Sequence, residues 1–124
     1  MLALWARSGS PPSPTDNSAS LELLLEHDAR SLLLAYADGS LAGSLIAVWN
    51  GWRGSFFRLA VDPSHRRRGI ASALVREGER RLRERGALRL DAIVARDDAA
   101  ATGLWRALGF ELQADRARFV RNLR

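Results

Sequence analysis

The pattern that most limits the possible folds is a long amphipathic segment between Gly69 and Arg85. Small or apolar residues recur there at every fourth position, and charged residues occupy the positions between them, which is the spacing of an α-helix with one buried face. Gly86 follows, and a glycine readily ends a helix. The buried stripe is expected to consist of Ile70, Ala71, Leu74, Val75, Gly78 and Leu82.

Two segments before this helix have the period of β-strands. Residues 31–37 run into Asp38-Gly39, a dipeptide that supplies the positive φ angles of a two-residue hairpin, and residues 41–49 return from it. We therefore expect an antiparallel pair.

A third strand is expected at residues 55–61. Alternation along this segment places Phe57, Leu59 and Val61 on one face. Pro63 lacks the amide that a ladder needs, so the strand ends before it and the three strands form a meander.

The part of the chain after the long helix continues the alternation of strands and helices. Residues 88–94 are expected to form a strand, and residues 98–108 a helix closed by Gly109. Residues 110–123 are expected to form a final antiparallel pair around a turn at Ala114-Asp115.

The chain begins with two short helical segments, separated by the Ser- and Pro-rich stretch 8–17. The first is residues 2–7, and the second is capped by Ser18 or Ser20 and runs to His27. The expected order is thus ααβββαβαββ. One sheet with helices on both faces would bury the apolar sides of all these helices and strands. We predict an α/β (α+β) fold with a mixed, mostly antiparallel central sheet.

Composition limits both the size of the protein and its chemistry. The 124 residues, 47% hydrophobic and 27% charged, fit one domain, residues 1–124, with a helical part at 1–30 and a sheet core at 31–124. No apolar run approaches the ~20 residues that cross a bilayer, so we expect a cytoplasmic protein without membrane contact. With no cysteine and two histidines, neither a thiolate nucleophile nor a metal site is expected.

The net charge of +5 comes from basic residues that are all arginine. Guanidinium groups suit phosphates, so the excess fits a phosphate-bearing ligand or a nucleic acid. The complete absence of lysine favours a simpler origin in the codon usage of a G+C-rich genome. Only local clusters of arginine are therefore informative.

The junction between the third strand and the long helix holds such a cluster. The first amides of a helix are unpaired and carry partial positive charge, so they favour anions. Gly69 and Ala71 leave room for a phosphate, and three arginines precede them, Arg66, Arg67 and Arg68. A solvated basic run and an ordinary loop glycine are the competing interpretations.

At these residues the sequence resembles the acetyltransferase (GNAT) family. The family's acetyl-coenzyme A signature, Arg/Gln-x-x-Gly-x-Gly/Ala after a strand, matches Arg66-x-x-Gly69-x-Ala71. A second family pattern, Asn-x-x-Ala-x-x-Leu-Tyr-x-x-x-Gly-Phe, corresponds to Asp98-x-x-Ala101-x-x-Leu104-Trp105-x-x-x-Gly109-Phe110. The element order agrees over residues 31–124.

The resemblance implies acetyl transfer from acetyl-coenzyme A (acetyl-CoA) to a primary amine by direct attack, without a metal. In the family the coenzyme pyrophosphate rests on the amides of the signature turn, and the pantetheine arm lies beside the preceding strand. A backbone amide near Val61 would then polarise the thioester carbonyl. The coenzyme-binding residues implied are Leu59, Ala60, Val61, Arg66, Arg67, Arg68, Gly69, Ile70, Ala71, Ser72, Asp98 and Trp105.

Two of these residues depart from the family pattern. Trp105 replaces the tyrosine that commonly protonates the thiolate, and an indole does not surrender its proton in practice. It packs in the core, contacts the coenzyme, or does both. Asp98 replaces an asparagine, and an acid there repels phosphates unless it caps the helix and points away.

The catalytic acid and base are left unassigned by the sequence. Family members often carry a glutamate on the strand equivalent to residues 55–61, where the only charged residue is Arg58. Removal of the amine's proton then runs through ordered water or through a carboxylate such as Asp91. His27 and His65 are expected to be structural or exposed.

The N-terminus departs further from the family. Members usually begin with a strand before the first helix, and residues 2–7 resemble that helix itself, so the first strand is missing. The start lies upstream, or the chain is a shortened member. An open sheet edge would then be available to a second copy, as in a homodimer.

Two other functions stay open. A catalytically weak acetyl-CoA-binding module fits Trp105, the missing strand and the absent glutamate. A nucleic-acid binder is less favoured, because acids interrupt the basic side of the long helix at Glu77, Glu79 and Glu84. The acceptor is not indicated; Trp49 and Trp52 could floor a pocket or cover an edge of the core.

Overall fold

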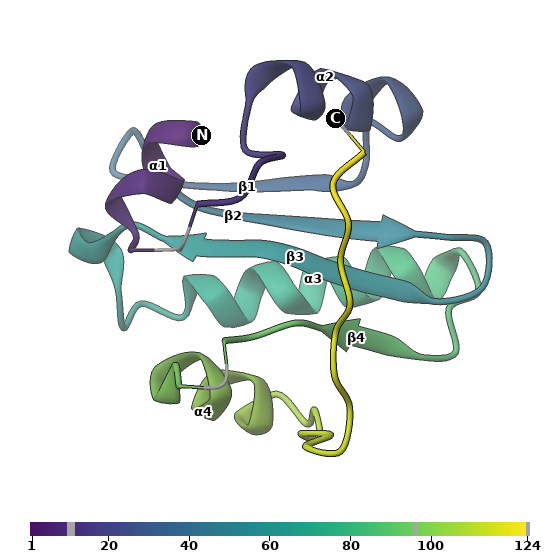
Figure 1. The fold of residues 1–124 in the computed structure, drawn as a ribbon. Coiled ribbons are helices and arrows are strands. Elements are labelled where there is room, and N and C mark those ends of the chain that lie inside the picture. Colours follow the sequence, from purple (N-terminus) through teal and green to yellow (C-terminus); the bar gives the residue numbers. More distant parts are fainter. Residues whose placement is uncertain (10–11, 96, 124) are drawn as a thin grey trace. The chain divides into compact units, whose positions relative to one another are not determined.

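The computed structural model describes residues 1–9, 12–95 and 97–123. They form two units, Met1–Ile93 and Val94–Arg124, each compact by itself. Figure 1 shows the helices and strands of both. The elements of the first unit are α1 (Leu2–Arg7), α2 (Ser18–His27), β1 (Leu32–Ala37), β2 (Ser40–Trp49), β3 (Gly54–Val61), the 3₁₀ helix η1 (Pro63–His65), α3 (Ile70–Glu84) and β4 (Leu90–Ala92).

The sheet has the strand order β1-β2-β3-β4. The first three strands form the predicted antiparallel meander, and β4 pairs parallel to β3 between Gly54–Phe56 and Leu90–Ala92. The mixed, mostly antiparallel sheet predicted from the sequence is confirmed. The strand expected at 88–94 is shorter than predicted and is confined to the three residues that pair with β3.

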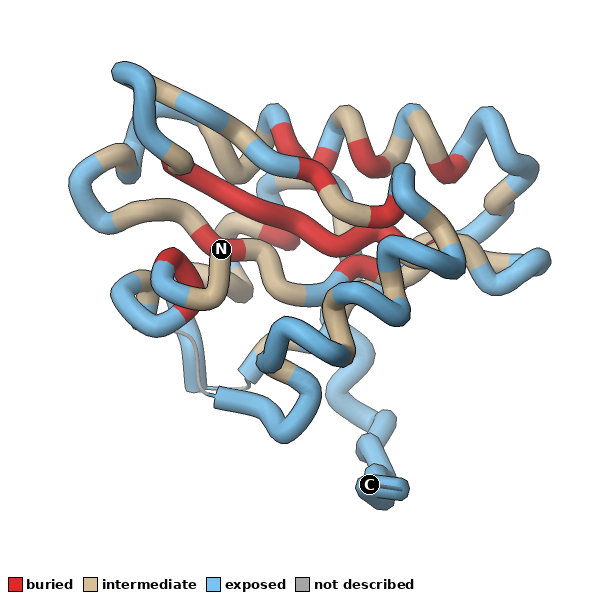
Figure 2. The backbone as a smooth tube through the Cα atoms, turned by 90° about the horizontal axis from the view of Figure 1, so that it is seen from above, coloured by how far each residue is buried: buried red, intermediate tan, exposed pale blue. Residues whose placement is uncertain are grey.

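One face of the sheet is covered by α1 and α2. Leu4 and Trp5 of α1 are buried against Ile46 and Ala60 of the central strands. Partly buried leucines of α2 join this cluster, which explains why a helix with a weak apolar stripe is stable here. Figure 2 shows the buried residues gathered along the central strands.

The other face is covered by α3, whose predicted apolar stripe is confirmed at Leu74, Val75, Gly78 and Leu82, whereas Ile70 and Ala71 are only half-buried. Glycines allow the close approach of helix and sheet. A Cβ atom on Gly78 would lie 2.7 Å from the Phe56 ring, and one on Gly43 would lie 2.8 Å from Ile70. Helices therefore lie on both faces of the sheet.

A β-bulge in β3 overturns one prediction. Ile46 pairs with Phe57 and Ser44 with Ala60, so two residues of β3, Arg58 and Leu59, oppose the single residue between them on β2. Arg58 takes a φ of 53°. Phe57 and Ala60 therefore share a face, and the alternation expected for Phe57, Leu59 and Val61 is wrong because a bulge adds one residue to the period.

The second unit contains α4 (Ala99–Ala107), close to the predicted helix 98–108. The antiparallel pair expected at 110–123 is wrong, because these described residues form no strand. A turn does occur at Ala114-Asp115, where the Arg116 N–H donates to Gln113 O at 3.4 Å. An isolated hairpin is marginal in water, and most side chains of the segment are exposed, among them Phe119, Val120 and Leu123.

Candidate functional site

The last residues of β3 present an edge of backbone. Ala60 and Val61 pair with β2 on one side, after the bulge that contains Leu59, whereas β4 on the other side reaches only Phe56. The N–H of Asp62 donates to Ala42 O at 2.7 Å, so the N–H of Val61 points away from β2. Among the strands of residues 12–95 none pairs with that side of Val61. The edge can therefore accept an extended ligand.

The bulge directs the side chain of Arg58 toward the face covered by α1. Its guanidinium lies 5.3 Å from the centre of the Trp5 ring and forms an ion pair with Asp16. Trp5 in turn donates from Nε1 to Ser44 Oγ at 2.8 Å. Asp16, from a stretch that the sequence marks only as irregular, is thus attached to the middle of β3.

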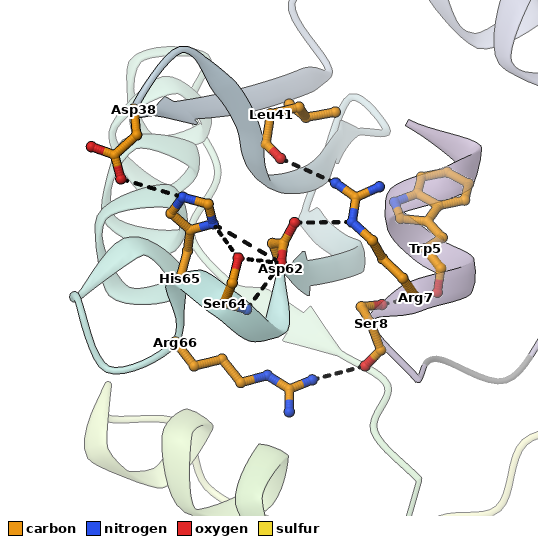
Figure 3. Close-up of polar contacts among 9 residues, drawn as sticks. All are labelled: Trp5, Arg7, Ser8, Asp38, Leu41, Asp62, Ser64, His65 and Arg66. Atoms are coloured by element: carbon orange, nitrogen blue, oxygen red, sulfur yellow. Dashed lines mark hydrogen bonds and ion pairs between the residues drawn. The ribbon is translucent and has the colours of Figure 1, made fainter.

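The turn after β3 is fixed by Asp62. Its Oδ1 accepts from the N–H of Ser64 at 3.0 Å and from Ser64 Oγ at 2.8 Å, and its Oδ2 accepts from Arg7 Nε at 2.9 Å (Figure 3). The Ser64 hydrogen bonds and Arg7 lower the pKa of Asp62 to about 2. The carboxylate is therefore ionised at neutral pH and joins α1 to the turn.

His65 lies inside this turn. Its Nε2 is 3.6 Å from Asp38 Oδ2, and its Nδ1 is 3.1 Å from Ser64 Oγ (Figure 3). The ring is mostly buried, which supports the structural role expected for it. His27 is exposed in the last turn of α2.

The three arginines of the signature are exposed. Arg66 donates to the carbonyl oxygen of Ser8 at 2.9 Å, and Arg68 donates to Asp38 at 2.9 Å. The Arg68 hydrogen bond lowers the pKa of Asp38. Arg67 takes a φ of 66°. Two of the arginines thus have partners inside the protein, at a surface where an anion can replace them.

Gly69 precedes α3 as its N-cap with a φ of 76°. Among the described residues beyond its chain neighbours and the helix backbone, no atom lies within 4 Å of the position that a Cβ would take. No described side chain caps the helix, so the amides of Ile70, Ala71 and Ser72 open its first turn without an acceptor side chain. This geometry leaves space and partial positive charge at one place, as anion sites at helix starts require.

The other two residues of the predicted coenzyme site lie in the second unit. Asp98 caps α4, with Oδ1 accepting from the N–H of Ala101 at 3.0 Å. Trp105 is 8% exposed and meets Phe110 edge to face, with 5.0 Å between ring centres. Asp98 therefore takes the capping role, and Trp105 packs within its own unit.

Three other residues weighed in the sequence lie toward the opposite end of β3. Asp91 is exposed and pairs with Ser55 of β3. Ser55 precedes Val61 by six residues, which is about 20 Å along a strand. Trp52 is exposed beneath the guanidinium of Arg53, 3.8 Å from the ring centre, and Trp49 approaches Gly86. Asp91 is thus too distant to serve an amine at Val61.

Sequence reasoning missed the contacts that join the N-terminal segment to β3. The partners in Arg58–Asp16 are 42 residues apart and those in Arg7–Asp62 are 55 apart. Neither the periodicity of a segment nor a short motif can predict contacts between residues so far apart in the sequence.

The described residues contain no group of three or more His, Asp or Glu side chains placed to hold a metal. Across the same residues, no helix has the length and hydropathy to span a membrane.

The family model described as acetyltransferase (GNAT) family matches residues 1–110. An acetyltransferase of Yersinia pestis (strain Pestoides F) is 33% identical over 113 residues, covering 91% of this chain and 80% of the relative. Ard1 from Thermoplasma volcanium has the same fold, with a TM-score of 0.81 at 22% identity over 92% of this chain and 76% of its own.

A further solved relative is AAC(6')-Iy in complex with the bisubstrate analog CoA-S-monomethyl-acetylneamine. It is 25% identical, with a TM-score of 0.75 over 98% of this chain and 88% of its own. The chain therefore belongs to the GNAT acetyltransferase family. As a member, it is an acetyl-CoA-dependent N-acetyltransferase.

Proposed function

We propose that the chain moves the acetyl group of acetyl-CoA to a primary amine by direct attack of the amine on the thioester. Leu59, Ala60 and Val61 hold the pantetheine arm by their backbone. The pyrophosphate lies on the turn and first helical residues, which are Arg66, Arg67, Arg68, Gly69, Ile70, Ala71 and Ser72. Coenzyme contacts at Asp98 and Trp105 of the second unit stay predictions from the motif alone.

The observation that carries this proposal is the start of α3 at Gly69, where no described side chain caps the helix. It follows, after η1 and the arginine turn, a strand edge that no other described strand pairs with. The start of α3 suits a diphosphate, and the edge of β3 suits an extended arm that carries amides. The N–H of Val61, aimed at the thioester oxygen, would contribute on the order of 3 kcal/mol to transition-state stabilisation. The bisubstrate complex of the solved relative supports coenzyme A as the ligand.

Binding of the donor is tested first. Acetyl-CoA at about 100 times its dissociation constant should stabilise the protein by about 2.7 kcal/mol, seen as a rise in melting temperature. Gly69→Glu should abolish that rise, because it places a carboxylate at the phosphate. Gly51→Glu is the matched control, since Gly51 has a φ of 89° and open space but lies in the distant β2–β3 turn. An equal rise in both variants would contradict the site.

Transfer is tested by thiol release from acetyl-CoA with a panel of ethylamine, L-alaninamide, lysine, spermidine and 2,2,2-trifluoroethylamine. Amine-dependent release supports the transferase. The packing of Trp105, which offers no transferable proton, favours a second candidate, a coenzyme-binding module of weak activity. Coenzyme binding without release by any amine would select this second candidate.

Three further expectations stay predictions: a single domain over residues 1–124, a cytoplasmic location and a homodimer through the sheet edge. Sedimentation at micromolar concentration tests the homodimer, which requires a species of twice 13.7 kDa.

A further inference from the structure

The ion pair at the bulge of β3 brings a carboxylate to the strand on which the thioester is proposed to lie. Arg58 Nε donates to Asp16 Oδ1 at 2.9 Å, and Arg58 Nη2 bonds Oδ2, which also accepts from the N–H of Ser13 at 2.9 Å. Both side chains of the pair are 17% exposed. The carboxylate is thus held in one orientation and still reachable by solvent.

The contacts of Asp16 leave room for another cation. A carboxylate offers about four lone-pair sites, and in the described residues three of them are filled, two by Arg58 and one by Ser13. The remaining site, on Oδ1, can accept from an ammonium without breaking the ion pair. Such charge-assisted hydrogen bonds are about twice as strong as neutral ones.

The location is suited to an acceptor. Arg58 precedes Val61 by three residues, a distance of about 10 Å along a strand. The Trp5 ring beside the guanidinium supplies a buried wall. An amine held at Asp16 is therefore attached, through Arg58, to the strand on which the N–H of Val61 points outward.

The other carboxylates along β3 in residues 1–93 are less suited. Asp62 is occupied by Ser64 and Arg7, and Asp91 lies at the far end of the strand. We infer that Asp16, held by Arg58, first binds the acceptor as an alkylammonium, which then releases its proton to solvent and attacks the thioester as the neutral amine. Asp16 thereby selects amines that are charged in solution. This inference rests on the acetyl transfer proposed above.

The test compares Asp16→Asn with Asp28→Asn. Asp28 is a close match, since its side chain is 15% exposed, pairs with Arg85 and accepts from one backbone N–H, that of Arg30. The acceptor probes are ethylamine, which is charged at pH 7.5, and 2,2,2-trifluoroethylamine, which is uncharged there. KM and kcat are measured for each amine and for acetyl-CoA.

Asp16→Asn should raise the KM of ethylamine about 10- to 100-fold and that of trifluoroethylamine less than about 3-fold, with the KM of acetyl-CoA within about twofold. Asp28→Asn should leave the KM values of ethylamine, trifluoroethylamine and acetyl-CoA within about twofold of those of the wild type. Equal increases for both amines would show a structural role only and overturn the inference, as would an unchanged KM for ethylamine.

Failure of the inference is separable from failure of the transferase. If wild-type protein binds acetyl-CoA but releases no thiol with any amine of the panel, the transferase proposal fails and the inference falls with it. Activity with other amines of the panel but not with ethylamine overturns the inference alone. If wild-type protein is active and the two variants behave alike, only the inference fails. If Asp16→Asn is unfolded at 25 °C, Asp16→Glu replaces it. That variant should raise the KM of ethylamine about 3- to 10-fold and leave that of trifluoroethylamine unchanged; any other result overturns the inference.

Discussion

The two faces of the sheet are held by different kinds of contact. On the α3 face, apolar side chains and glycines fit closely, as between Gly78 and Phe56. On the α1 face, a small apolar cluster is supplemented by polar contacts between distant segments, such as Arg7–Asp62 and Arg58–Asp16. The proposed acceptor site borders the second face, whereas the proposed donor site lies at the edge of β3 and the first turn of α3. The packed face thus maintains the fold, and the polar contacts of the α1 face join the N-terminal segment to β3 and to the turn after it.

Truncating one buried leucine on each face should separate these roles. Leu82→Ala on α3 and Leu4→Ala on α1 should each reduce the free energy of unfolding by about 3 kcal/mol, because each leaves a cavity in a buried cluster. Denaturant titration measures this loss. Only Leu4→Ala should also raise the KM of acetyl-CoA, because α1 leads to Arg7 and Ser8, the partners of Asp62 and Arg66. Equal KM values in the two variants would show that α1 does not affect the turn.

A methyl group added to the packed face tests how closely it fits. Gly78→Ala should lower the free energy of unfolding by about 1–3 kcal/mol, because the new Cβ would lie 2.7 Å from the buried Phe56 ring. Gly103→Ala in α4 is the control, since nothing lies within 4 Å, and it should stabilise the helix by about 0.5–1 kcal/mol. A stabilised Gly78→Ala would mean that helix and sheet separate without cost.

The polar face should respond to acid. The pKa of Asp62 falls from 3.8 to about 2 on folding, so its contribution to stability is complete above pH 3.8 and is lost as the pH drops toward 2. Asp62→Asn should therefore melt a few degrees below wild type at pH 7, and the gap should close between pH 4 and pH 2. Melting curves across this range measure it. A gap independent of pH would assign the loss to packing rather than charge.

Most of the packed face was predictable from the sequence, and much of the polar face was not. The stripe on α3, the hairpin at Asp38-Gly39 and the turn from Arg66 to Ala71 all follow from local spacing. The bulge at Arg58 does not, because it depends on how β3 pairs with β2 rather than on the period of β3 itself. The pair expected at 110–123 failed for a similar reason, since strands there need a sheet partner that local pattern does not supply.

The bulge also changes what kinds of sequence variation β3 can tolerate. At the bulge, Arg58 and Leu59 of β3 lie opposite a single residue of β2. The extra residue reverses the alternation of the strand, and it therefore determines to which side every later residue of β3 points. Deleting one residue at this point would turn the N–H of Val61 toward β2 and move Asp62 away from Arg7. The fold can therefore tolerate single substitutions in the strand. An insertion or deletion between Gly54 and Gly69, by contrast, would disrupt both the donor site and the acceptor site. Among relatives that keep the activity, insertions and deletions should fall outside this segment.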